Sequence, residues 1–395
     1  MSHASRIGVP RHWLLYLCTA TALLHAAFQS VRVLVSYRIL ALGGDATTIG
    51  LVTALYAIVP LIAAVRMGRA VDRGHATMIL RIGIVVSTLG VGLIAASSGL
   101  LVLGAGNIVL GLGQLLVTVS GQAFVSILSP PDRLDRGFAG ITLGVSVGQA
   151  VGVPVAGIIA AGHSADDGYV ETTGALLVMT AICAVALPFV LGLREPPGSG
   201  RTADDGAPQS VLSMLSTPGM KPAMLSSLIV LAAVDLVVVY LPLLGEQFGF
   251  GVLLVSALLT ARTLTSILSR ALLPWALRHV GRRRLLISAT AGTVVPVALI
   301  PFLPNPWLIA AMLAVCGAFW GVGQPLTMTW VVELVAPSDR ASALAVRLTG
   351  NRLGQVLVPV AAGGIAGIAG VASVFWVTAA LLSAAATSTW RALRT

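Results

Sequence analysis

Charged residues are scarce in this sequence of 395 residues. Asp, Glu, Lys and Arg together make up 10% of it, whereas an ordinary soluble domain contains roughly 25%. Hydrophobic residues make up 57%. This composition excludes a soluble globular protein, and we expect the lipid bilayer to be the main solvent of the chain.

Lysine and cysteine are nearly absent as well. Lys221 is the only lysine, so the chain has no GxxxxGK phosphate loop and is not a single-chain ATP-driven pump. Cys18, Cys183 and Cys316 lie in apolar blocks without a CxxC pair or metal-ligand spacing. No HExxH motif occurs, and 144 GVSVG 148, which formally matches a serine nucleophile elbow, lies in an apolar helix. We therefore expect no catalytic residue, no metal and no cofactor, although a membrane enzyme or receptor remains the rival class.

The apolar residues come in twelve blocks of about twenty, the length that crosses a bilayer as a helix. We predict an all-α membrane protein with an N-terminal six-helix bundle (1–193), a polar linker rich in Pro and Gly (194–221) and a C-terminal six-helix bundle (222–395). The predicted spans are 13–40, 48–66, 77–96, 100–128, 137–162, 172–193, 222–244, 251–270, 284–302, 306–334, 342–368 and 371–390.

The basic residues predict the orientation of these spans. All but five of the 24 Lys and Arg fall on the side that holds both termini and the linker, which the positive-inside rule makes cytoplasmic. The opposite connections contain acidic residues, such as Asp45 and Glu246, but no Lys or Arg. Topology thus explains the net charge of +10 better than nucleic acid does. We expect a monomer in the plasma (inner) membrane of a bacterium.

The two sets of six spans resemble each other. A shift of 203 residues places Tyr37 on Tyr240, and 111 GLGQLL 116 in the fourth span resembles 321 GVGQPL 326 in the tenth. The fifth and eleventh spans each carry a Gly-Gln pair followed by a proline; these residues are Gly148, Gln149, Pro154, Gly354, Gln355 and Pro359. The order of these matches favours a six-helix unit used twice in parallel, the plan of a transporter with its site between the halves.

The connection between the second and third spans, 68 GRAVDRGHATMILR 81, resembles the signature of the major facilitator superfamily. The resemblance covers nearly the whole chain and implies a transporter that works by alternating access. It implies a cytoplasmic gate, to which we assign the following residues: Gly68, Asp72, Arg73, Gly74, Arg136 and Arg340. In another reading, the basic residues of this loop only set the topology.

Among these transporters, the chain is most similar to bacterial proton-coupled exporters of drugs and small molecules, with departures. Asn107 stands where that group has an arginine in the fourth span, and Val153 separates the glycine and proline that are adjacent in the group. Gly148 and Gly152, four residues apart, allow two helix backbones to approach closely. We predict a packing role for them and a hinge role for Pro154 and Pro359.

Ionisable residues inside spans usually face a water-filled cavity or each other, because contact with lipid is costly. Six candidates for proton coupling or cavity lining lie inside spans that the resemblance assigns to the cavity: His25, Arg32, Asp235, Arg262, Glu333 and Arg352. The shift of 203 residues places Arg32 on Asp235, so we predict an ion pair that acts as a switch. His25, two turns from Arg32, either relays protons or only packs. Glu333 either takes part in proton coupling or is only paired with Arg340 or Arg347.

The expected function is secondary active transport of a small organic molecule driven by a proton gradient, most simply export by antiport. The alternative is proton-coupled uptake of an anionic or zwitterionic solute, which Arg262 and Arg352 would suit. Polar side chains in the same spans are the candidate substrate contacts, and they are Tyr37, Tyr240, Asn107, Gln149, Asn351 and Gln355.

Overall fold

The computed structural model describes residues 12–129, 134–162, 170–194, 211–335 and 340–394. In these ranges nearly every residue is helical, and twelve helices are long and apolar enough to span a membrane. The predicted all-α architecture with twelve spans is confirmed for the described residues. Apolar runs of this length form helices because a bilayer offers no water to hydrogen-bond an open backbone.

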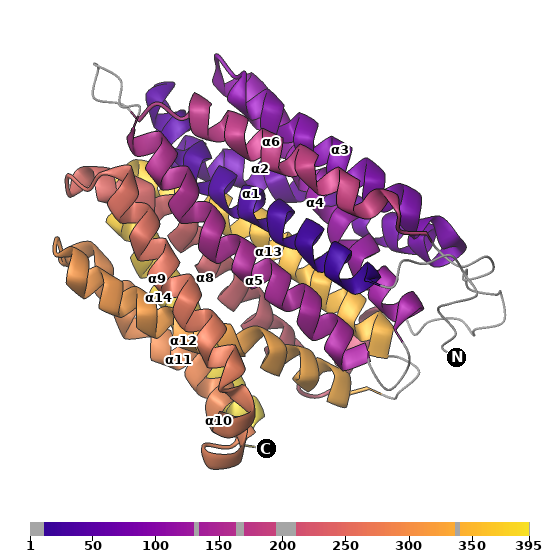
Figure 1. The fold of residues 1–395 in the computed structure, drawn as a ribbon. Coiled ribbons are helices and arrows are strands. Elements are labelled where there is room, and N and C mark those ends of the chain that lie inside the picture. Colours follow the sequence, from indigo (N-terminus) through magenta and orange to yellow (C-terminus); the bar gives the residue numbers. More distant parts are fainter. Residues whose placement is uncertain (1–11, 130–133, 163–169, 195–210, 336–339, 395) are drawn as a thin grey trace. The chain divides into compact units, whose positions relative to one another are not determined.

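The helices fall into two compact units. The first contains α1 (Trp13–Ala41), most of α2 (Ala46–Ala70), the π-helical turn η2 (Val71–His75), α3 (Ala76–Ala95), α4 (Leu100–Leu128), α5 (Leu134–Ala161) and α6 (Thr173–Leu191). The second contains α7 (Val211–Ser216), α8 (Met220–Gln247), α9 (Val252–Ala271), α10 (Leu273–His279), α11 (Arg282–Leu299), the 3-10 turn η4 (Ile300–Phe302), α12 (Pro306–Glu333), α13 (Arg340–Ala369) and α14 (Ala372–Ala392). Figure 1 shows both sets as long ribbons coloured along the chain.

The predicted repeat appears in the packing within each unit. In the first unit α1 packs on α5 and α6, and α3 packs on α4 and α6. In the second unit the corresponding helices make the same pairs: α8 packs on α13 and α14, and α11 packs on α12 and α14. Each unit is thus built on one plan, as the matched sequence motifs indicate.

The glycines of the matched 111 and 321 motifs have equivalent surroundings. A Cβ added at Gly111 would lie 2.0 Å from the Tyr56 carbonyl oxygen of α2. A Cβ at Gly321 would lie 2.6 Å from the Ser266 carbonyl oxygen of α9. The two glycines allow α4 to touch the backbone of α2 and α12 to touch the backbone of α9, each within its own unit.

Specific residues set where several helices begin and end. The Asn305 side chain accepts hydrogen bonds from the backbone N–H groups of Trp307 and Leu308, and Pro306 occupies the first turn of α12. Between α2 and α3, Gly74 adopts φ 86° within η2, a left-handed conformation that glycine adopts readily. It separates α2 from α3 and explains the glycine in this loop.

The boundaries differ from the prediction in two places. Residues 44–54, which include the first turns of α2, cluster with the second unit. The short helices α7 and α10 occupy segments that the sequence predicts as linker and loop. Most of the predicted linker, residues 195–210, lies outside the described residues.

Candidate functional site

Three polar residues form a stripe on α13. Arg347, Asn351 and Gln355 follow one another at intervals of four residues, so they share a face of the helix. All three are buried. Asn351 and Gln355 are hydrogen-bonded to two buried residues of α8, Ser227 and Asp235 respectively. We call this group, together with Arg352 and with Gln324 and Thr327 of α12, the polar seam.

Asp235 is the acidic member of the seam, and its side chain is 3% exposed. Gln355 donates a hydrogen bond from Nε2 to Oδ2 of Asp235 over 2.6 Å. The Oε1 atom of the same amide accepts a hydrogen bond from Nη1 of Arg352 over 2.9 Å. One glutamine amide therefore links the carboxylate to a guanidinium, and the two charged groups fix which way the amide points.

The rest of the seam is a network around Arg347. Its Nη2 donates to Oε1 of Gln324 over 2.6 Å and to Oγ1 of Thr327 over 3.2 Å. Gln324 in turn donates to the Ser227 carbonyl oxygen over 3.3 Å, and the Ser227 hydroxyl donates to Oδ1 of Asn351 over 3.0 Å. The network joins α8, α12 and α13 through buried and half-buried polar groups, and buried polar groups are stabilising only when they are hydrogen-bonded.

Positive charge exceeds negative charge inside the second unit. Among the described residues of that unit, the buried charged side chains are Asp235, Arg262, Arg347 and Arg352. Arg262 lies on α9 and donates to the neighbouring Thr263 hydroxyl over 3.3 Å. A buried excess of arginine favours anionic over cationic ligands, because an unbalanced buried charge is costly.

Comparison with known proteins identifies the kind of molecule that carries this seam. The family model described as Major Facilitator Superfamily matches residues 17–259 and 223–394. The chain belongs to the major facilitator superfamily. The resemblance predicted from the 68–81 motif is thereby confirmed, and the chain is a multi-pass membrane transporter rather than an enzyme.

Solved structures agree with this family in fold. A mutant of the nucleoside transporter NupG superimposes with a TM-score of 0.80 at 17% sequence identity, covering 96% of this chain and 99% of that one. A bacterial homologue of the human lysosomal transporter Spinster, in an inward-facing and unoccupied conformation, gives a TM-score of 0.74 at 16% identity, covering 97% and 96%. No curated protein sequence matches the chain.

The family's gate motif is only partly described. Gly74 has the left-handed backbone noted above, and Gly68 lies in the last turns of α2 with open space around its Cα. The side chains of four other predicted gate residues lie outside the described part of the structure, namely Asp72, Arg73, Arg136 and Arg340. Their gate role stays a prediction.

Helices α1 and α5 are in close contact at two glycines of α5, Gly148 and Gly152. A Cβ added at Gly148 would lie 2.1 Å from the Ala22 carbonyl oxygen, and one at Gly152 would lie 2.4 Å from the Ala26 carbonyl oxygen. Pro154 lies inside α5, two residues further along. Pro359 has the equivalent place inside α13.

The predicted cavity residues of the first unit have local partners. The Arg32 guanidinium lies over the Tyr56 ring, 5.8 Å from its centroid. The His25 ring meets the Phe28 ring edge-on, with centroids 5.4 Å apart. Arg32 and Asp235 belong to different units, and the ion pair between them stays a prediction.

The predicted substrate contacts differ in how much of each side chain is exposed. Tyr37, Tyr240 and Asn107 are buried, and Gln149 is half-buried. The Tyr240 hydroxyl donates to the Ala46 carbonyl oxygen over 2.8 Å, a contact within the second unit. Asn351 and Gln355 belong to the polar seam.

The interior placement predicted for Glu333 is wrong. Glu333 is the last residue of α12, its side chain is 54% exposed, and it forms an ion pair with Arg282 at the start of α11. The carboxylate escapes burial because the helix ends there and solvent is within reach. Of the two partners considered from the sequence, Arg347 bonds to Gln324 and Thr327 instead, and the Arg340 side chain lies outside the described part of the structure.

Sequence reasoning also missed residues with clear roles. Arg38 donates to the Ser97 carbonyl oxygen over 2.6 Å and to the Thr173 hydroxyl over 3.0 Å, and lies 3.9 Å from a Glu171 carboxylate oxygen. It thereby ties the end of α1 to the segment that follows α3 and to the start of α6. Arg347 was overlooked as a site residue because it lies near the start of its span. The spacing of Arg347, Asn351 and Gln355 was the signal that could have revealed it.

Proposed function

We propose that this transporter couples the movement of a small organic molecule to the movement of protons, with Asp235 as the group that carries the proton, and that it works as an exporter by proton antiport. The observation that supports coupling is the buried chain from Asp235 through Gln355 to Arg352. The proton gradient is the energy source, and no cofactor takes part in the proposal.

The amide of Gln355 gives the coupling a chemical route. When Asp235 is ionised, its carboxylate accepts a hydrogen bond from Nε2, and Oε1 of the amide accepts from Arg352. When Asp235 binds a proton, its carboxyl O–H becomes a donor and needs an acceptor. The amide satisfies this need by turning its oxygen toward Asp235. Arg352 then faces an N–H group, to which it cannot donate.

Protonation of Asp235 therefore releases Arg352 from its acceptor. The released guanidinium changes which ligand or which helix arrangement is favoured, and a proton can shift a conformational equilibrium only through such a difference between states. Buried ionisable groups in membrane helices are typical of proton relays.

A second candidate function is uptake of an anionic or zwitterionic solute together with protons. The buried excess of arginine over carboxylate in the second unit favours it. In this case, Arg352 released by protonation of Asp235 becomes a ligand for the anionic group of the solute. Proton binding and solute binding would then support each other.

Accumulation of radiolabelled solutes in proteoliposomes distinguishes the two. A panel of organic anions, zwitterions and cations is offered under pH gradients of both directions. Antiport predicts accumulation when the lumen is acidic, whereas symport predicts accumulation when the outside is acidic, and a protonophore abolishes both. We expect Asp235→Asn to lose accumulation and Glu333→Gln, the matched exposed carboxylate, to keep it. Accumulation in Asp235→Asn that still follows the pH gradient would contradict the role of Asp235.

A further inference from the structure

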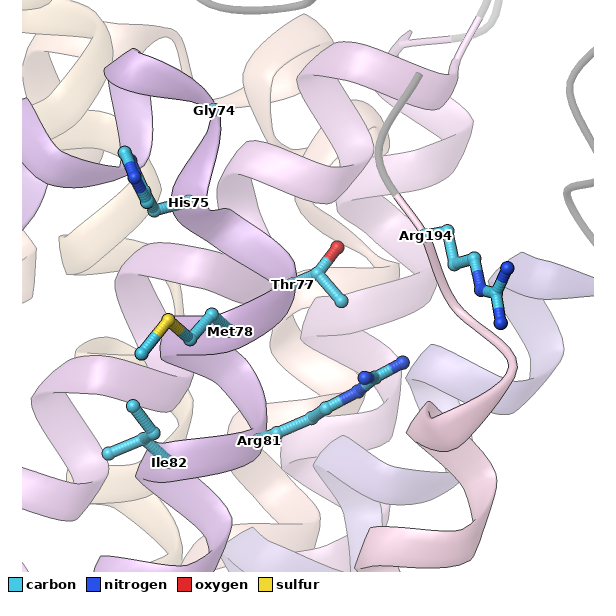
Figure 2. A pocket seen from close by; sticks show the side chains of 7 residues that line it. All are labelled: Gly74, His75, Thr77, Met78, Arg81, Ile82 and Arg194. Atoms are coloured by element: carbon cyan, nitrogen blue, oxygen red, sulfur yellow. The ribbon is translucent and has the colours of Figure 1, made fainter. Parts of the chain in front are cut away.

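A surface pocket of about 600 Å³ lies in the first unit, apart from the polar seam. It is formed where α3 begins and where the chain leaves α6, and Arg81 and Arg194 both line it. Figure 2 shows the Arg81 side chain extending from α3 toward the segment that carries Arg194. Among the described residues that line the pocket, two are arginines and none is acidic, so the charge of this described lining suits an anion.

Arg81 is held in place by backbone groups. Its Nη2 donates to the carbonyl oxygens of Leu191 and Leu193, over 2.6 Å and 3.2 Å, at the end of α6. Both acceptors are neutral, so the hydrogen bonds orient the guanidinium without cancelling its charge. An oriented guanidinium is well suited to a phosphate, because it loses little conformational freedom on binding.

Arg194 supplies the second positive charge. It follows the end of α6 by three residues and is exposed. Among the described residues we find no carboxylate paired with it. The two arginines come from segments more than 100 residues apart in the sequence, which is why no local motif announces the pocket.

The depth of the pocket matches the level of lipid headgroups. Arg81 lies five residues inside the span that begins at Ala76, a rise of about 7.5 Å along the helix. A long arginine side chain near the end of a span reaches the membrane interface. Arg194 lies three residues beyond the span that ends at Leu191.

An apolar surface continues from the pocket along α3. Met78 and Ile82 line the pocket itself, and Figure 2 shows both on α3, with their side chains on the other side of the ribbon from that of Arg81. Along the same face, at helical spacing, the exposed side chains are Met78, Ile82, Val85, Leu89 and Leu93. A soluble phosphate has no apolar group that could contact this surface, whereas the acyl chain of a phospholipid can lie along it.

We propose that this pocket binds an anionic phospholipid, with its phosphate between Arg81 and Arg194 and an acyl chain along the exposed face of α3. The pocket borders Gly74 and His75, so the lipid lies next to the gate motif. The proposal is independent of proton coupling and of the transported solute.

The test is a lipid titration of the purified full-length protein in detergent, followed by native mass spectrometry. Phosphatidylglycerol is compared with phosphatidylcholine, and glycerol phosphate is added as a soluble competitor. We expect tighter binding of phosphatidylglycerol and no displacement by equimolar glycerol phosphate. Arg81→Gln and Arg194→Gln should each weaken phosphatidylglycerol binding roughly fivefold, the ratio that corresponds to ~1 kcal/mol for one basic residue at an anionic surface.

Arg66→Gln is the matched control, because Arg66 is an exposed arginine at the end of α2 that does not line the pocket. It should leave phosphatidylglycerol binding unchanged. If Arg81→Gln fails to fold because it loses its bonds to the end of α6, Arg194→Gln decides the matter alone. Unchanged phosphatidylglycerol binding in Arg194→Gln, equal binding of the two lipids, or displacement by glycerol phosphate would each overturn the proposal.

Discussion

At the scale of single residues, Gln355 connects two charged members of the polar seam. Its amide serves two buried charged groups at once, donating to Asp235 and accepting from Arg352. A buried hydrogen-bonding group that loses its partner costs about 1–3 kcal/mol, and a charged one costs more. The glutamine therefore stabilises the fold as well as connecting the two charges.

We predict that Gln355→Leu lowers the free energy of unfolding by about 2–3 kcal/mol, because it leaves both charged groups without their amide partner. The measurement is thermal unfolding of the purified protein in detergent. Gln114→Leu in α4, half-buried and outside the seam, is the control and should change the stability by less than about 0.5 kcal/mol. Equal unfolding temperatures for wild type and Gln355→Leu would show that the amide bridge is not formed.

Asp45 is a second residue whose role follows from its hydrogen bonds. Its Oδ1 accepts from the backbone N–H of Thr48 over 2.8 Å and from the Thr48 hydroxyl over 2.7 Å, at the start of α2. These bonds favour the ionised form and lower the pKa of Asp45 below its usual value. The stabilisation is thus present above the usual pKa and is lost as the pH falls through the lowered value.

We predict that Asp45→Ala costs about 1 kcal/mol at neutral pH, as expected for the loss of a helix N-cap. The difference between the variant and wild type should shrink as the pH falls through the lowered pKa of Asp45. Asp45→Asn keeps an acceptor for Thr48 but does not titrate, so its stability relative to Asp45→Ala should not follow pH. Unfolding curves of the three proteins over acidic pH check this. A constant difference between wild type and Asp45→Ala would show that the ionised carboxylate caps α2 no better than the protonated one.

At the scale of helices, small residues decide which pairs can touch. The backbones of α1 and α5 approach each other at Gly148 and Gly152, where any side chain would meet a carbonyl oxygen. Such contacts between membrane helices depend on van der Waals packing and not on the hydrophobic effect, because lipid tails are as apolar as the side chains.

We predict that Gly148→Ala destabilises the protein by about 1–3 kcal/mol, because its Cβ would lie 2.1 Å from the Ala22 carbonyl oxygen. Gly121→Ala in α4 is the matched control, since nothing lies within 4 Å of the added Cβ. It should keep or raise the stability, because alanine favours the helix. Thermal unfolding in detergent measures both variants. If the two substitutions had the same effect, tight packing at Gly148 would be disproved.

Helix positions could be predicted from the sequence because each span is decided by its own composition. A run of twenty apolar residues must be helical in a bilayer whatever its neighbours are, so the twelve spans were predictable. The helices α7 and α10 have only six and seven residues. They fall below the length at which hydropathy gives a signal, and they were missed.

The seam was only partly predictable. Asp235 and Arg352 stand out because charges are rare in apolar runs, but the sequence cannot show that Gln355 connects them, since α8 and α13 are far apart along the chain. The same limit explains the error at Glu333. Its position inside an apolar run indicates burial, whereas the end of α12 leaves it exposed and paired with Arg282.

At the scale of the whole molecule, the distribution of basic residues predicts the topology. The twelve candidate spans among the described residues, together with the arginines that gather in alternate connections, predict that both termini lie on the cytoplasmic side. We predict that a fluorescent protein fused to the C-terminus is fluorescent in the bacterial cytoplasm and that alkaline phosphatase fused there is inactive. Phosphatase inserted after Phe248, between α8 and α9, should be active. If the C-terminal phosphatase fusion were active, the predicted orientation would be wrong.

The proposed coupling requires Asp235 to bind and release a proton inside the membrane. Infrared difference spectroscopy of the purified protein during a pH titration measures this directly, without a known substrate, through the C=O stretching band of protonated carboxyl groups. We predict that wild type shows a component that is missing from Asp235→Asn and shifted in Gln355→Leu, while Glu333→Gln keeps it. Identical carboxyl bands in wild type and Asp235→Asn at every pH would contradict the role of Asp235 as the group that carries the proton.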